Sequence, residues 1–263
     1  MQVEALQEYI EILNTPIDNL SWDEFLSRLN EGAVFTPNVD HLMSLRHDSE
    51  FRTAYAQADY RVCDSQVLLY ASRFLGTPIK EKISGSDLLP VFCDHHRAND
   101  EIKIFLLGGA EGVPQKAMKN INARIGREIV VAAHSPSFGF EKNEVECEQI
   151  SEMIRQSSAT VLVVGVGAPK QEKWIAKHRH QLPNVKIFMG LGAAIDFEAG
   201  YKSRSPKWIS DLGLEWLYRL RSEPKRLWRR YLLRDIPFLW LLLQQKFSQP
   251  YPSENRYSSE SRF

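Results

Sequence analysis

Several features that would indicate other classes of protein are scarce or missing in this 263-residue sequence. The cysteines Cys63, Cys93 and Cys147 are odd in number and scattered, which argues against a disulfide framework and predicts a reducing compartment. The 33 Lys and Arg balance the 33 Asp and Glu, so the overall charge does not point to a nucleic-acid partner. The first residues, "MQVEALQEYIEIL", lack the apolar stretch of a signal peptide, so we expect a protein that is not secreted.

Two further features are too weak to define a class. The apolar run "IPFLWLLL" at residues 236–243 is far shorter than the roughly 20 residues that span a bilayer. The stretch "CDHH" at residues 93–96 contains residue types that bind metals. Because consecutive residues point to different sides of a helix, a polar helix end is the favoured interpretation, and we expect no metal site.

What the sequence does contain is a recurring unit of an apolar segment, a small or polar residue and a helical pattern. The apolar segments show no alternation, which is typical of strands buried on both faces of a parallel sheet. Strands and helices that alternate about every 25 to 35 residues indicate βαβ units. We therefore predict a doubly wound α/β domain over residues 1–200, with helices on both faces and ligands beyond the carboxyl ends of the strands. The expected strands are "GAVF", "YRVC", "IKIFLLG", "REIVVAA", "ATVLVVG" and "VKIFMG".

Three of these strands end in glycine turns, at Gly108-Gly109, Gly165-Val166-Gly167 and Gly190-Leu191-Gly192. A glycine at a strand end lets a phosphate approach the backbone, and the following helix N-terminus favours its charge. For any single turn, the geometry of the connection explains the glycine equally well. The stretch "VLVVGVGAPKQEKW" lacks the third glycine of G-x-G-x-x-G, and no acidic residue follows a fingerprint at the expected spacing. A nicotinamide-dependent oxidoreductase is therefore a weakly supported alternative.

Polar residues follow the first two strands. In "TPNVDH", Thr36 and Asn38 suit the hydroxyl groups of a sugar, and we expect Asp40 near the cap of the next helix. Asp64 follows the second strand, with Ser65 as the expected cap of the helix behind it. A carboxylate at Asp64 is either a general base or a helix cap, and spacing alone favours the cap.

After residue 200 the sequence changes character. Residues 202–234 contain ten Lys and Arg against three Asp and Glu, with tryptophans interleaved. We predict that residues 201–246 form a basic, amphipathic helical appendage at a membrane surface. The alternative is that its apolar face packs on the protein's own sheet or on a second subunit, which leaves a homo-oligomer open. Residues 247–263 are polar and are expected to be disordered.

Three stretches together resemble the WecG/TagA/CpsF family of bacterial glycosyltransferases: "FTPNVDH", "GVGAPKQEKW" and the run from "GLGAAIDFEAG" to "EPKRLWRRYL". The resemblance covers about residues 15–240. It implies a Rossmann-like core and an inverting transferase that needs no bound metal or other cofactor, with which the lack of a D-x-D motif is consistent. Such enzymes move a sugar, often of the N-acetylmannosamine type, from a UDP-sugar to a polyprenyl-diphosphate-linked sugar. The implied location is the cytoplasmic face of the cell membrane.

The resemblance also implies roles for particular residues. Asp64 matches the proposed base, which would take the proton from the acceptor hydroxyl. The implied substrate-binding residues are Thr36, Asn38, Lys82, Gly85, Gly108, Gly167, Gln171 and Asp196. Lys82 stands where the family usually has Arg, which keeps the charge but loses the bidentate fork.

The implied acceptor-diphosphate residues are Arg219, Arg221, Arg226 and Arg229. A non-catalytic peripheral membrane scaffold is the other alternative, and a silent Asp64→Asn substitution would support it. The transferred sugar and the acceptor do not follow from the fold.

Overall fold

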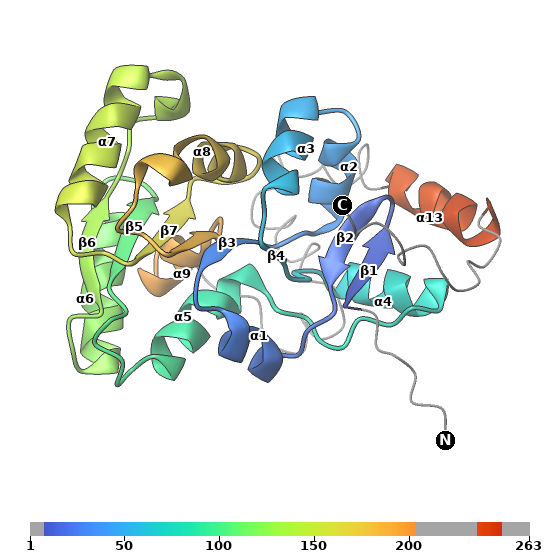
Figure 1. Cartoon of the computed structure of the whole chain (residues 1–263), viewed down its shortest axis with the longest axis horizontal. Helices are drawn as coiled ribbons and strands as arrows, with labels where there is room; N and C mark the ends of the chain where they lie inside the picture. The colour runs from blue at the N-terminus through green and yellow to red at the C-terminus, as the bar shows by residue number, and fades with distance from the viewer. Residues whose placement is uncertain (1–7, 203–235, 249–263) are drawn as a thin grey trace, which may run out of the picture.

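The computed structural model describes residues 8–202 and 236–248. Its centre is a six-stranded sheet in which every neighbouring pair of strands is parallel, which confirms the predicted α/β class (Figure 1). In spatial order the strands are β4 (Tyr60–Arg61), β3 (Gly32–Phe35), β8 (Ile187–Gly190), β7 (Val161–Gly165), β5 (Ile104–Gly108) and β6 (Val130–His134). All six coincide with segments expected from the sequence.

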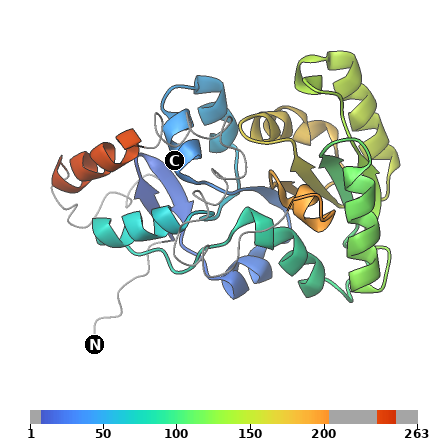
Figure 2. The ribbon, with the colours of Figure 1, turned by 180° about the vertical axis from the view of Figure 1, so that it is seen from behind.

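Helices cover both faces of the sheet, as the unbroken apolar strands require (Figure 2). Successive residues of one strand serve opposite cores: Leu106 packs in the first and Leu107 in the second. The first core contains residues of α1 (Trp22–Arg28), α5 (Gly85–His95), α6 (Val113–Ile125) and α9 (Ala194–Glu198). The second contains residues of α3 (Ser49–Ala56), α7 (Glu144–Gln156) and α8 (Lys170–His178).

The order of the strands places a topological switch between β7 and β5. The helix α8 after β7 packs on the second face and leads to β8, whereas α6 after β5 packs on the first face and leads to β6. Connections that leave adjacent strands toward opposite faces open a crevice at the carboxyl edge, where ligands bind in such sheets. The register aligns Phe35 with Gly190, and Gly108 with Gly165, so the loops after β3, β8, β7 and β5 follow one another along this edge.

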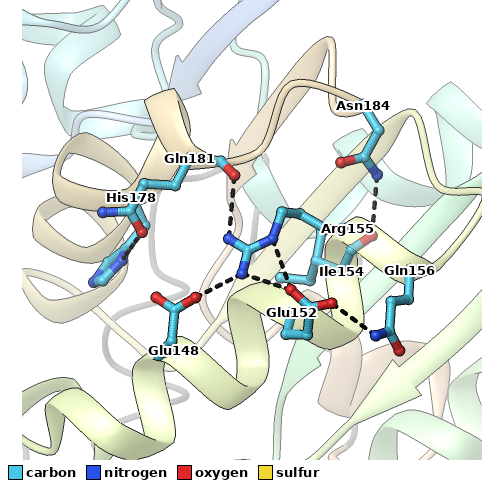
Figure 3. Close-up of polar contacts among 8 residues, drawn as sticks. All are labelled: Glu148, Glu152, Ile154, Arg155, Gln156, His178, Gln181 and Asn184. Atoms are coloured by element: carbon cyan, nitrogen blue, oxygen red, sulfur yellow. Dashed lines mark hydrogen bonds and ion pairs between the residues drawn. The ribbon is translucent and has the colours of Figure 1, made fainter.

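Polar contacts attach α7 to the segment that leads into β8 (Figure 3). Arg155, which Glu148 and Glu152 of the same helix hold at 2.6 and 2.7 Å, donates to the carbonyl of Gln181 at 3.4 Å. The side-chain amide of Asn184 donates to the carbonyl of Ile154 at 3.0 Å. These contacts hold the start of β8 in place and lie away from the carboxyl edge of the sheet. Short 3₁₀ helices, η1 (Phe140–Lys142) and η2 (Arg179–Gln181), flank this region in the chain.

An antiparallel hairpin of β1 (Tyr9–Ile12) and β2 (Thr15–Asp18) stands beside the main sheet. The sequence analysis did not predict it, although Ile10, Ile12 and Ile17 place apolar residues on one side around a turn at Asn14. Leu13 and Asn14 both have positive φ, 49° and 60°, a conformation that suits the tight turn of a hairpin and that Asn tolerates. Together with α2 (Val39–Leu45), α4 (Gln66–Leu75) and α13 (Ile236–Ser248), the hairpin encloses a third core.

Helix α13 contains the apolar run "IPFLWLLL" and packs on the hairpin and α4, not on the main sheet. Phe238 and Leu242 are buried in the third core. Gln245 fixes the helix to the hairpin, because its amide accepts from the Leu13 N–H at 2.9 Å and donates to the Glu11 carbonyl at 3.0 Å. The other side of α13 is exposed at Leu239, Trp240, Leu243 and Phe247.

One side of α13 therefore packs within the protein, but on the hairpin and α4 and not on the main sheet that the alternative named. The helix continues to Ser248, two residues past the predicted boundary at 246. Among the helices of residues 8–202 and 236–248, none is long and apolar enough to cross a bilayer. The predicted basic segment 203–235 and the predicted tail beyond residue 248 lie outside the described residues.

All three cysteines are buried and unpaired. Burial raises the pKa of Cys63 and of Cys93 to about 12. Cys93 lies in the first core, whereas Asp94 forms an exposed ion pair with Arg97 at 3.0 Å. The "CDHH" stretch is thus the polar end of a helix, as favoured from the sequence.

Candidate active site

Three chain segments bring Thr36, Asp64 and Gly85 together at the carboxyl edge. Asp64 Oδ1 accepts a hydrogen bond of 2.8 Å from the N–H of Gly85. A Cβ atom built on Gly85 would lie 3.1 Å from Thr36 Oγ1, so the glycine lets α5 approach the end of β3 closely. The Asp64 N–H donates to the carbonyl of Pro37 at 3.0 Å, which ties the loops after β3 and β4.

Asp64 does not cap the helix that follows it. Ser65 fills that role, as predicted, and accepts from the Leu68 N–H at 3.4 Å. Asp64 instead binds the first amide of α5, whose own N-cap residue Ser84 makes no side-chain cap bond. A helix N-terminus stabilises a negative charge, so the structure holds a carboxylate at this edge. This bond uses only Oδ1.

Asn38 is the N-cap of α2, since its Oδ1 accepts from the His41 N–H at 3.1 Å. Asp40 lies in the first turn of α2, two residues after this cap, which confirms the expectation that it lies near the cap. His41 in turn connects α2 to α3, because its Nδ1 lies 2.7 Å from the hydroxyl of buried Tyr55.

The three glycine turns form one continuous row. A Cβ on Gly108 would lie 2.5 Å from the carbonyl oxygen of Gly165, and a Cβ on Gly165 would lie 2.7 Å from that of Gly192. Only glycine permits such close backbone approach. Among residues 8–202 and 236–248, nothing lies within 4 Å of a Cβ built on Gly167 or Gly192, so these residues leave the outer surface of the row open. We call the turns at Gly108, Gly167 and Gly192 the glycine platform.

Gln171 connects two turns of this platform from behind. Its Oε1 accepts from the N–H of Gly167 at 3.1 Å and from that of Gly192 at 3.0 Å. Its side chain is buried, and its Nε2 donates to Glu172 Oε1 at 2.8 Å. In this structure Gln171 positions the two turns, and the direct donor contact implied by the resemblance stays a prediction.

Lys82 and Asp196 lie on two different segments near this edge. The Ile83 N–H donates to the Cys63 carbonyl at 2.8 Å, which places Lys82 beside the segment that carries Asp64. Asp196, in α9 after the Gly192 turn, forms an ion pair with Lys202 at 3.0 Å. The roles of both residues toward a donor stay predictions. Arg219, Arg221, Arg226 and Arg229 lie outside the described residues.

The sequence analysis assigned no role to Glu172, which lies directly behind the platform. Its side chain is fully buried, and this burial raises the pKa of the carboxyl group from 4.5 to about 7. No local signal marked it, because the buried residues of α8 also include the polar Gln171 and His178. Gln171 and Glu172 are adjacent in the "GAPKQE" block, but the sequence alone does not show that their side chains form a hydrogen bond.

The fold defines an α/β protein in which a carboxylate and a row of glycine turns lie along the carboxyl edge of one parallel sheet. Residues 10–251 match the profile of the family described as "Glycosyl transferase WecG/TagA/CpsF family". The chain belongs to this family and is a glycosyltransferase, which removes the oxidoreductase alternative. The resemblance seen in the sequence is confirmed.

Two relatives show how far the similarity extends. An N-acetylglucosaminyldiphosphoundecaprenol N-acetyl-beta-D-mannosaminyltransferase of Staphylococcus aureus (strain MRSA252) is 31% identical over 247 residues, 90% of this chain and 93% of the relative. The protein of the same description from Bacillus spizizenii is 29% identical over 205 residues, 77% and 76% of the two chains. The similarity therefore extends through the hairpin, the sheet and most of the C-terminal region.

Proposed function

We propose that this chain transfers an N-acetylmannosamine-type sugar, with inversion, from a UDP-sugar to an N-acetylglucosaminyl diphosphate carried on a polyprenol. The printed names of the relatives support the transferred sugar and the acceptor. The observation that carries the mechanism is the placement of Asp64 at the N-terminus of α5, in the row of loops that contains the glycine platform. A base and an anion-binding surface side by side are what an inverting transfer needs.

On the donor side, the glycine platform suits the diphosphate of a UDP-sugar. Open glycines let phosphate oxygens approach backbone amides, and the helices that begin behind the turns add the field of their N-termini. Lys82 supplies a positive charge from the neighbouring segment. These groups stabilise the charge that gathers on UDP as it leaves.

On the acceptor side, Asp64 takes the proton from the attacking hydroxyl. The acceptor oxygen forms a bond to the anomeric carbon while the bond from that carbon to the UDP oxygen breaks, and UDP leaves with the electron pair. A single displacement of this kind inverts the anomeric centre. A positioned base contributes about 10² to 10⁴ in rate.

The lipid-linked acceptor requires the enzyme to work at a membrane surface, on the cytoplasmic side. The exposed side of α13, which carries Leu239, Trp240, Leu243 and Phe247, suits the interface between headgroups and acyl chains. The acceptor diphosphate is assigned to Arg219, Arg221, Arg226 and Arg229 by the resemblance. Truncation after residue 200 is a poor test of this assignment, because it also removes α13 from the third core.

The test is UDP release from a panel of UDP-sugars, with and without a short-chain polyprenyl diphosphate that carries N-acetylglucosamine. We expect release with UDP-N-acetylmannosamine that depends on the acceptor. Acceptor-dependent release with a different UDP-sugar would correct the sugar and keep the reaction. An absence of release with every donor would overturn the proposal and favour a non-catalytic scaffold.

A further inference from the structure

Glu172 is a buried acid that the proposed reaction does not use. Its side chain is fully buried behind the glycine platform, where its Oε1 would lie 3.4 Å from a Cβ built on Gly190 of β8. Within the described part of the chain, no Lys, Arg or His forms an ion pair with it. A buried carboxyl group without a cation costs stability compared with an apolar side chain of similar size. The position therefore needs an explanation other than packing.

The one side-chain hydrogen bond of Glu172 determines which way the Gln171 amide points. The oxygen and nitrogen of a glutamine amide have nearly the same shape, so neighbours must select between two orientations. On one side, the N–H groups of Gly167 and Gly192 require an acceptor. On the other side, Glu172 Oε1 requires a donor, which Gln171 Nε2 supplies at 2.8 Å.

Loss of the hydrogen bonds on either side of the Gln171 amide would remove the fixed orientation on which the bonds on the other side depend. Without an acceptor at residue 172, Nε2 of Gln171 would be buried with no partner, and the bridge to the two turns would lose its fixed orientation. A flipped amide would direct its NH₂ group at two backbone donors. The turns after β7 and β8 would then lose the contact that sets their spacing.

We propose that Glu172 is a positioning residue for the glycosyl transfer: it orients Gln171, which holds the Gly167 and Gly192 turns in the geometry that binds the donor diphosphate. This inference rests on the proposed function, because it takes the glycine platform as the donor site. It assigns to Glu172 no contact with either substrate. Its effect should therefore appear in donor affinity and not in acceptor affinity.

The decisive experiment exchanges the two side chains. In Gln171→Glu, two carboxyl groups face each other, and at pH 8 we expect UDP to bind at least tenfold more weakly than to the wild type. In the double variant Gln171→Glu/Glu172→Gln, residue 172 donates to residue 171, which still accepts from both glycines. We expect this exchange to restore UDP affinity to within about threefold of the wild type. If residues 171 and 172 only filled space, the second substitution would not rescue the first.

Single substitutions at residue 172 give a second readout. Glu172→Gln keeps an acceptor oxygen, so the KM for the donor should stay within about threefold of the wild type. Glu172→Leu removes the acceptor and should raise that KM at least tenfold, with the KM for the acceptor unchanged. Ile175→Val, a buried change in the same helix that touches none of these bonds, is the control for lost stability.

Two outcomes separate this inference from the proposed function. If wild-type protein does not bind UDP, the donor assignment is wrong and the inference fails with it. If wild-type protein binds UDP, but Glu172→Leu binds it equally well or the exchange is no better than Gln171→Glu, the positioning role alone is wrong.

Discussion

Asp64 and Gly85 are 21 residues apart in the sequence, and a hydrogen bond of 2.8 Å joins the carboxylate of one to the N–H of the other. The bond satisfies the first amide of α5 and fixes the direction of the carboxylate at the same time. Structural and catalytic interpretations of Asp64 therefore do not compete. In our proposal, the observed helix cap and the base are the same side chain.

We predict that Asp64→Asn lowers kcat about 10²-fold to 10⁴-fold, because an amide cannot take the acceptor proton. Its oxygen can still accept from Gly85, so the midpoint of thermal unfolding should stay close to that of the wild type. Asp64→Ala, which loses the cap as well, should cost about 1 kcal/mol of unfolding free energy. Near-normal turnover of Asp64→Asn in the UDP-release assay would show that another group is the base.

We predict that Gly165→Ala disrupts the platform. The added methyl would lie 2.7 Å from the Gly192 carbonyl oxygen and 2.9 Å from Ile195 Cδ1, so the turns must separate. Overpacking of this kind costs about 1 to 3 kcal/mol, and UDP affinity should fall with it. Gly126→Ala is the control: among the described residues a Cβ there meets nothing within 4 Å, and the residue lies far from the platform. Its positive φ of 83°, which Gly165 does not share, adds backbone strain of its own, so this variant separates lost stability from lost UDP affinity. Equal UDP affinity in the two variants would argue against the platform.

We predict that Glu172 makes stability fall as pH rises toward neutrality. The carboxyl pKa is about 7 in the folded protein, against 4.5 for the ordinary group, so between these values the folded state holds a proton that the unfolded state has lost. The contribution is fully present below pH 4.5 and is lost as pH rises through 7. Over that range the unfolding free energy of the wild type should fall by about 3 kcal/mol relative to Glu172→Gln. Parallel stability curves for the two proteins in urea titrations would contradict this.

We predict that the two sides of α13 have separable roles. Phe238→Ala, on the buried side, should cost about 3 to 5 kcal/mol of unfolding free energy. Trp240→Ser, on the exposed side, should change stability by less than about 0.5 kcal/mol but lower sedimentation with anionic phospholipid vesicles severalfold. If Trp240→Ser destabilises the protein and leaves vesicle binding intact, the exposed side has a partner within the protein.

The parallel sheet could be predicted because its strands are unbroken runs of Val, Ile, Leu and Phe, which suit burial on both faces. The glycine turns followed from the same pattern, since each glycine comes directly after such a run. The hairpin was missed because its strands have only four residues each and its second strand contains Pro16. A short strand stabilised by a distant helix leaves little periodic signal.

The partners within the site could not be predicted, because they depend on which loops meet. Gln171 bonds to Gly192, 21 residues later in the chain, and only the pairing of β7 with β8 brings them together. Glu172 carries no local signal that distinguishes a buried acid from one exposed on a helix. The sequence singled out the "GAPKQE" block, but the contacts of its residues follow from the pairing of β7 with β8.

The hydrogen bond between Leu13 and Gln245 joins residues 232 positions apart, so the third core cannot be closed until α13 has been synthesised. During translation, α2 and α4 can pack on the hairpin long before Phe238 and Leu242 are available. The part of this core that Phe238 and Leu242 fill therefore stays open until then, while the sheet beside it is already able to fold.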